Sequence, residues 1–195
     1  GKPGKPNSKG YTNASIFRVL CIAREFKILN SADEHSPVVD WLKQLAAVVH
    51  GECGGKGVGA LGMCLTGNFA LSMMVEPAVR APVLCQPSVP VNDAAGIHAS
   101  AEDIAIVRDR MEREDLTLRG YRFAGDKHCK AVRFEAFSAA LGPRFEGEVL
   151  PDSAAKPDTF NPNPHSVVTT HLIDEAGSLT RQKVDEIIGF FKLRL

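Results

Sequence analysis

The feature that most constrains the fold is a short apolar segment that leads, through a cysteine between small residues, into a helix-like segment. Residues 57–64 are apolar and bounded by glycines, which is typical of a strand buried on both faces of a parallel sheet. Residues 65–75 follow directly, with no linker, and are expected to form a helix. A buried strand that passes directly into a helix favours an α/β fold over an all-helical or all-β one.

The alternation of strand-like and helix-like segments continues along the chain. Strands are expected at residues 81–85, 116–123 and 145–150, and helices at 36–51, 100–115, 130–141 and 179–193. Residues 11–30 also fit helical spacing, and residues 1–15 are expected to include a loop or flexible segment. No internal repeat or domain linker is evident, so we expect one domain over residues 1–195, with a mostly parallel sheet flanked by helices.

Composition excludes several classes of partner. The 195 residues contain 23 Lys plus Arg and 23 Asp plus Glu, so no net field favours nucleic acid or an anionic membrane surface. No stretch approaches the roughly 18 apolar residues of a membrane span. The five cysteines are odd in number and include no C-x-x-C pair, which argues against a disulfide framework or a structural zinc site. We expect a soluble, cytoplasmic protein with a small-molecule ligand.

Cys64 lies where the apolar strand meets the helix, in the position of a nucleophile at a sharp turn. Such a turn strains the backbone and requires a very small residue two positions earlier, which Gly62 provides. A thiol at a helix N-terminus favours the thiolate, and the N–H of Leu65 can act as an oxyanion donor. The alternative interpretation is an ordinary buried core cysteine.

A catalytic triad requires an acid after a later strand and a histidine in a late loop. Asp126 follows the strand that ends at Phe123, although a turn or helix-capping aspartate is an alternative interpretation. Two histidines lie further along, His165 after a Pro-rich loop and His171 in a segment that is expected to be packed or helical. We prefer His165 as the base and leave His171 open, whereas His128 is too close to Asp126 in sequence.

Three segments in this order resemble the dienelactone hydrolase family of α/β-hydrolases. The resemblance extends from about Arg18 to the C-terminus and rests on residues 62–67, on residues 124–126 with Arg133-Phe134 behind them, and on residues 164–169. It implies an α/β-hydrolase fold with a triad of Cys64, Asp126 and His165. It also implies hydrolysis of a lactone or carboxylic ester through a thioester, without a metal or an organic cofactor.

Two features depart from the family pattern. Thr66 stands where the family usually has Gly, and Gly67 follows one place later. The first 57 residues have room for about one strand and two helices, and they contain no recognisable oxyanion loop. The chain is therefore expected to begin after the first strands of the family fold. This would expose a sheet edge that favours a homo-oligomer, and it makes a catalytically impaired relative that acts as a binding module the second hypothesis.

Other side chains have simpler interpretations. Trp41 and the Phe residues at apolar positions (Phe123, Phe134, Phe137, Phe145, Phe190 and Phe191) are expected in the core. The charged run at residues 108–114 is expected to be a solvated helix face. The loop at residues 86–98 either lines the pocket through Gln86, Ser88 and His98 or is a plain surface loop.

Overall fold

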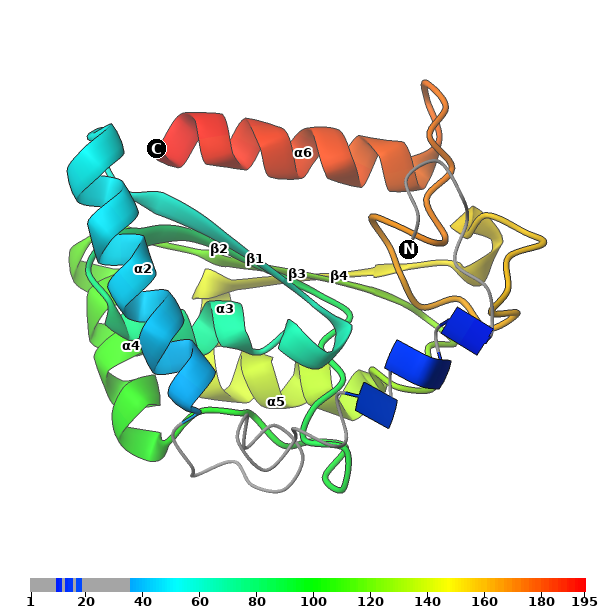
Figure 1. Cartoon of the computed structure of the whole chain (residues 1–195), viewed down its shortest axis with the longest axis horizontal. Coiled ribbons are helices and arrows are strands. Elements are labelled where there is room, and N and C mark those ends of the chain that lie inside the picture. The colour runs from blue at the N-terminus through cyan, green and yellow to red at the C-terminus, as the bar shows by residue number, and fades with distance from the viewer. Residues whose placement is uncertain (1–9, 12, 16, 19–35) are drawn as a thin grey trace.

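Four parallel strands form the centre of the molecule. The computed structural model describes residues 10–11, 13–15, 17–18 and 36–195 (Figure 1). Within these residues the strands are β1 (Val58–Met63), β2 (Val79–Cys85), β3 (Leu118–Phe123) and β4 (Phe145–Leu150). They pair in the order β1-β2-β3-β4, and every pair is parallel. The predicted α/β class with a parallel sheet is thus confirmed.

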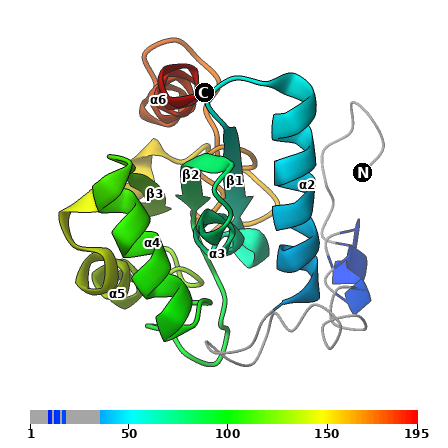
Figure 2. The ribbon, with the colours of Figure 1, turned by 90° about the vertical axis from the view of Figure 1, so that its left-hand side faces the viewer.

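Helices cover both faces of this sheet. They are α2 (Pro37–Cys53), α3 (Phe69–Ser72), α4 (Ala101–Arg113), α5 (Ala131–Leu141) and α6 (Leu179–Arg194). Helix α6 lies on one face, α3, α4 and α5 lie on the other, and α2 runs beside β1 (Figures 1 and 2). Parallel strands require such crossover connections, which explains why both sheet faces are apolar.

Side chains that alternate along the strands point to opposite faces of the sheet and pack into two apolar clusters, one on each face. Leu118 of β3 packs with α3, α4 and α5, whereas Tyr121 and Phe123 of the same strand pack toward Ile187 and Phe190 of α6. Helix α4 begins at the expected cap, since the Ser100 hydroxyl accepts a hydrogen bond from the Asp103 N–H at 3.0 Å.

The boundaries of the predicted elements shift in places. Helix α2 continues past Gly51 to Cys53 and is followed by Gly54 at φ +70°, a conformation that suits glycine. Residues 10–11, 13–15 and 17–18 are helical, and the remainder of the predictions for residues 1–15 and 11–30 lies outside the described residues. No helix in the described part of the chain is long and apolar enough to cross a membrane.

Trp41 is not a core residue, contrary to the sequence-based expectation. Its side chain is 58% exposed, and Leu45, Val48 and Val49 on the same helix are also exposed. The apolar face of α2 is broader than the contact it makes beside the edge of the sheet, so part of that face remains at the surface. Five of the six Phe residues expected in the core are buried, and Phe191 is partly buried.

Arg110 corrects the interpretation of the charged run. Most of the run is exposed, but Arg110 is buried, and its guanidinium donates to the carbonyl oxygens of Glu76 at 2.8 Å and Pro77 at 3.0 Å. It also pairs with Glu114 at 2.8 Å. The helix turns this one position toward the sheet, where an arginine can satisfy main-chain acceptors that an apolar residue would leave unpaired.

Candidate active site

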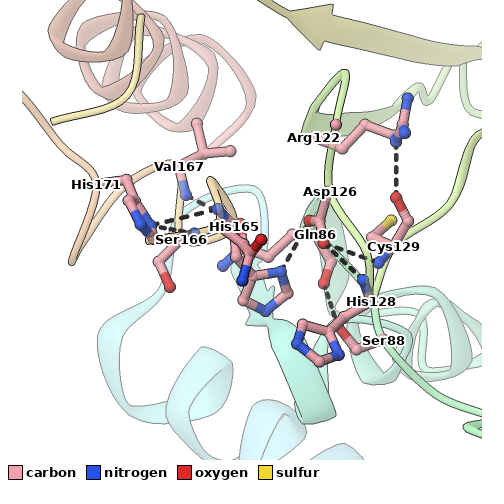
Figure 3. Close-up of polar contacts among 12 residues, drawn as sticks. Gln86, Ser88, Arg122, Asp126, His128, Cys129, His165, Ser166, Val167 and His171 are labelled. Atoms are coloured by element: carbon pink, nitrogen blue, oxygen red, sulfur yellow. Dashed lines mark hydrogen bonds and ion pairs between the residues drawn. The ribbon is translucent and has the colours of Figure 1, made fainter. Parts of the chain in front are cut away.

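The parallel sheet brings the predicted site residues to one edge. Cys64 directly follows β1, Asp126 follows β3, and His165 lies in the long connection between β4 and α6. Because all four strands run in the same direction, their carboxyl ends meet at a single edge, where α/β proteins place their ligand sites. Figure 3 shows Asp126 and His165 facing one another across this edge.

Cys64 has the strained backbone expected of a nucleophile turn. Its φ is +52°, in the left-handed region that non-glycine residues rarely adopt. Its carbonyl oxygen accepts hydrogen bonds from the N–H groups of Gly67 and Ser88, each at 3.0 Å. A Cβ at Gly62 would collide with the carbonyl oxygens of Thr66 and Gly67, so the turn requires glycine there.

The helix predicted over residues 65–75 is present as a succession of short helical turns. It consists of a 3₁₀ turn at Cys64–Thr66, the single turn of α3, and a second 3₁₀ turn at Met73–Val75. The residues that link these turns, Gly67, Asn68 and Met73, keep right-handed helical backbone angles, so the segment winds as one irregular helix. The Thr66 hydroxyl shapes its 3₁₀ start, because it bonds to both the N–H and the carbonyl of Met63, at 3.2 and 3.0 Å.

Gly67 accounts for the departure at Thr66. A Cβ at Gly67 would collide with the ring and Cα of Pro87, in the loop that follows β2. The backbone at residue 67 thus has to approach Pro87 closely, one position later than the glycine of the dienelactone hydrolase pattern. Thr66 is tolerated because its side chain turns back onto the end of β1.

Asp126 is enclosed and hydrogen-bonded through both carboxylate oxygens. Its Oδ2 lies 2.8 Å from Nδ1 of His165. Its Oδ1 accepts from the N–H groups of His128 at 2.9 Å and Cys129 at 3.1 Å. Arg122 braces the same turn by donating to the carbonyl oxygen of Cys129 at 2.9 Å. Asp126 therefore both shapes its turn and orients the His165 ring.

The second ring nitrogen of His165 has no hydrogen-bond partner among the described residues. Nε2 is buried and makes no hydrogen bond of normal geometry to the described groups, so its approach to the thiol is looser than a formed bond. The two side chains are nevertheless close enough to change each other's pKa. Loose contacts of this kind are usual in catalytic pairs without substrate, and they tighten in the reacting complex.

The shifts in pKa favour a thiolate and an imidazolium. Burial raises the pKa of the Cys64 thiol, but the nearby ring and charge of His165, with smaller contributions from the Ser88 hydroxyl and the Leu65 N–H, outweigh it, so the pKa lies below its usual 9. Burial lowers the pKa of His165, but Asp126 and Cys64 outweigh that effect and raise it to about 9. Both shifts are in the direction that stabilises a thiolate beside an imidazolium.

His171, the alternative base, has a different environment. Its Nδ1 accepts hydrogen bonds from the N–H groups of His165 at 3.3 Å and Ser166 at 3.0 Å. Its Nε2 lies 3.0 Å from the carbonyl oxygen of Asn161 and 3.2 Å from the hydroxyl of Thr159. Both ring nitrogens are occupied, and neither contacts Asp126. The geometry therefore places His165, and not His171, beside the acid.

The loop after β2 lies beside the site at its start and reaches the surface at residues 91–93. Gln86, Ser88 and His98 are all buried. Gln86 has φ +39°, and its side-chain oxygen accepts from the Val167 N–H at 3.2 Å, which joins this loop to the loop of His165. Ser88 lies against Cys64, as described above. His98 packs its ring near that of Phe69.

Arg133 supports the site in a way that was not predicted from sequence. It is buried in α5 and donates to the main-chain carbonyl oxygens of the β2 loop, namely those of Val89, Pro90, Asp93 and Gly96. A cation flanked by Val132 and Phe134 in a largely apolar helix was the available signal, but the sequence does not show which carbonyl oxygens its guanidinium meets.

Comparison with known proteins adds no name to this geometry. No protein-family model matches the chain, and no curated protein matches it. Among the described residues, no group of three His, Cys, Asp or Glu side chains could hold a metal ion. The arrangement itself, a strained cysteine beside a buried His–Asp pair, is what bears on function.

Proposed function

We propose that this protein is a cysteine hydrolase of the α/β-hydrolase type, similar to dienelactone hydrolases, that cleaves a lactone or carboxylic ester. The observation that carries the proposal is the buried Asp126–His165 pair, 2.8 Å apart, beside a cysteine whose pKa is lowered and whose backbone is in the left-handed region. Perturbed groups gathered at the ligand-binding edge of a parallel sheet are typical of catalytic sites.

In the proposed reaction, Cys64 attacks as a thiolate. A bond forms between its sulfur and the carbonyl carbon, and the negative charge on the resulting oxyanion is stabilised by the Leu65 N–H. Collapse of this intermediate breaks the ester C–O bond, and His165 gives its proton to the departing alkoxide. Water then attacks the thioester, His165 takes up the water's proton, and the acid product leaves as the thiolate–imidazolium pair forms again.

The nucleophile also restricts the substrate. A thiolate is a poor match for an ester whose alkoxide leaving group is strongly basic, because the tetrahedral intermediate then expels the thiolate more readily than the alkoxide. Activated esters and enol lactones release a less basic oxygen and are the proposed class. The reaction needs no metal or organic cofactor, and the partner is a small molecule.

A second function, that of a binding module with slow turnover, is favoured by one observation about the oxyanion donors. The Leu65 N–H is the first oxyanion donor of the proposed reaction, and within the described residues no strand pairs with the outer edge of β1 to supply a second donor from its loop. One oxyanion donor is worth about 10²- to 10³-fold in rate. With a single donor the chain could bind such molecules and turn them over slowly, as a binding module, and the edge of β1 could pair with a second copy.

The cysteines bear on the compartment. The four that the structure describes, Cys53, Cys64, Cys85 and Cys129, are all free thiols. Free thiols are compatible with a reducing compartment, and a cytoplasmic location is part of this proposal.

Hydrolysis of a p-nitrophenyl ester and of an enol lactone tests the proposal. Cys64→Ala and His165→Ala should each abolish turnover, whereas Cys53→Ala, which changes an exposed cysteine far from the pair, should leave it unchanged. Turnover that survives Cys64→Ala would refute the mechanism. Alkylation of Cys64 by iodoacetamide in a protein that turns over neither substrate would support the binding module instead.

A further inference from the structure

His171 is a buried histidine that takes no chemical part in the proposed reaction. It is 2% exposed, and the hydrogen-bonding positions of its ring are directed at the polypeptide around the base. Figure 3 shows its ring beside the main chain of His165 and Ser166. A polar side chain this deeply buried is costly unless its bonds are satisfied, so its position calls for a specific role.

The protonation state of the ring follows from its partners. Nδ1 faces two main-chain N–H groups, those of His165 at 3.3 Å and Ser166 at 3.0 Å, and must therefore be an acceptor. The ring proton is then on Nε2, which donates to the carbonyl oxygen of Asn161 at 3.0 Å. The Thr159 hydroxyl donates to the same carbonyl at 2.6 Å. The ring thus bridges two separate turns of the β4–α6 connection.

The same residue connects the base loop to the strand of the acid. The N–H of His171 donates to the Ser166 carbonyl at 3.1 Å, and its own carbonyl accepts from the Lys156 N–H at 2.8 Å. The ring meets the side chain of Phe123 edge-on, with the ring centroids 6.1 Å apart. Phe123 ends β3, three residues before Asp126. His171 therefore contacts both the main chain of His165 and the end of β3, the strand that leads to Asp126.

We propose that His171 is a positioning residue for His165. Its Nδ1 accepts a hydrogen bond from the main-chain N–H of His165 and so fixes the position of the His165 backbone. The His165 ring can then place its Nδ1 against Asp126 and its Nε2 toward Cys64. This inference rests on the proposed function, because it concerns the base of that reaction. What it requires is an acceptor at the place of Nδ1, and the Nε2 donor is secondary.

Two amide variants separate the nitrogens of the ring. In His171→Asn the side-chain oxygen can take the place of Nδ1 and keep the acceptor, whereas in His171→Gln the amide group reaches the place of Nε2 and leaves the two N–H groups unpaired. Misplacement of a catalytic group by about 1 Å costs about 10²-fold. We expect kcat to fall about 30- to 100-fold in His171→Gln with little change in KM, and to stay within about 5-fold of the wild type in His171→Asn.

Alkylation of Cys64 provides a readout that needs no substrate. Its rate as a function of pH, followed by peptide mass spectrometry, reports the thiolate that His165 stabilises, and exposed Cys53 is an internal control in the same sample. The Cys64 profile should move to higher pH in His171→Gln and remain in place in His171→Asn. If the wild type hydrolyses neither substrate, the proposed function fails, while these profiles still test the positioning role.

The result that overturns the inference is equally specific. A folded His171→Asn protein that loses kcat and shifts the Cys64 profile would show that an acceptor at Nδ1 is not sufficient. A His171→Gln protein with wild-type kcat and profile would show that the acceptor is not needed. If His171→Gln fails to fold, His171→Asn alone still decides, because it must then retain both activity and profile.

Discussion

Replacing Asp126 by Asn should trap His165 in the wrong tautomer. The Oδ1 position faces the N–H groups of His128 and Cys129, at 2.9 and 3.1 Å, so it must be occupied by the amide oxygen. The amide NH₂ then faces Nδ1 of His165, which becomes an acceptor, and the ring proton moves to Nε2. A neutral ring that presents N–H to Cys64 cannot take its proton.

The magnitude follows from the shift in the pKa of His165. That pKa is about 9 in the folded protein, with Asp126 the largest of the favourable contributions, against an ordinary value of 6.5. A difference of this size corresponds to roughly 3 kcal/mol of stabilisation of the imidazolium at about 1.4 kcal/mol per pKa unit. Loss of the carboxylate removes the hydrogen bond that is the largest favourable contribution to it. We expect kcat to fall about 10²- to 10⁴-fold, the lower figure from the lost stabilisation and the upper one from the wrong tautomer.

Two measurements test this prediction: steady-state kinetics on the aryl ester, and the pH profile of Cys64 alkylation, which should shift upward as the imidazolium is lost. Asp152→Asn is the matched control. Asp152 lies beside the same turn, and its Oδ1 accepts from the Gly125 N–H at 2.7 Å, a role that an amide oxygen can keep. An unchanged alkylation profile in a folded Asp126→Asn protein would refute the reasoning.

Three further predictions concern stability, measured by urea denaturation. Gly62→Ala should destabilise the protein by about 1–3 kcal/mol, because its Cβ collides with main-chain oxygens. Gly189→Ala, in open space on α6, should instead stabilise it by about 0.5–1 kcal/mol, and equal effects would contradict the geometry. Arg133→Met should cost about 3 kcal/mol or more, since four carbonyl oxygens lose their donor, against less than about 0.5 kcal/mol for exposed Arg113→Met. Because the pKa of His165 is raised on folding, the protonated ring stabilises the folded protein fully below about pH 6.5, and this contribution is lost as pH rises through about 9. The difference in unfolding free energy between wild type and Asp126→Asn should therefore shrink over that range. A difference that grew would be evidence against the Asp126–His165 pair.

Local pattern accounts for the elements and for their order. Apolar runs bounded by glycine, the cap at Ser100 and the proline at the first position of α2 are short-range features, and the strands and helices they predict are present within a few residues. The same reasoning placed Cys64 after a strand, Asp126 after a later strand and a histidine in a late loop. In a parallel sheet that order is enough to bring such residues to one edge.

Side-chain surroundings were decided by the tertiary structure. The apolar face of α2 predicted a buried Trp41. The helix lies beside the edge of the described sheet, however, and that edge is too narrow to cover the whole apolar face, so Trp41 stays exposed. Arg110 belongs to a charged run yet is buried. The sequence does not predict this, because only the packed fold shows which charged position of α4 faces the interior. The helix expected after Cys64 starts with a 3₁₀ turn instead of an α-helical one, and the Thr66 contacts that shape this turn are not visible to a propensity argument.

The sequence by itself determined the α/β alternation and the chain order of cysteine, acid and histidine, because both depend on periodicity and short-range turns. Which of His165 and His171 lies beside Asp126 was decided by tertiary structure. The two histidines are six positions apart in one irregular connection, and what separates them is which one meets Asp126 at 2.8 Å and which one accepts from the main chain. The contact with Asp126 joins residues 39 positions apart, which no local pattern encodes.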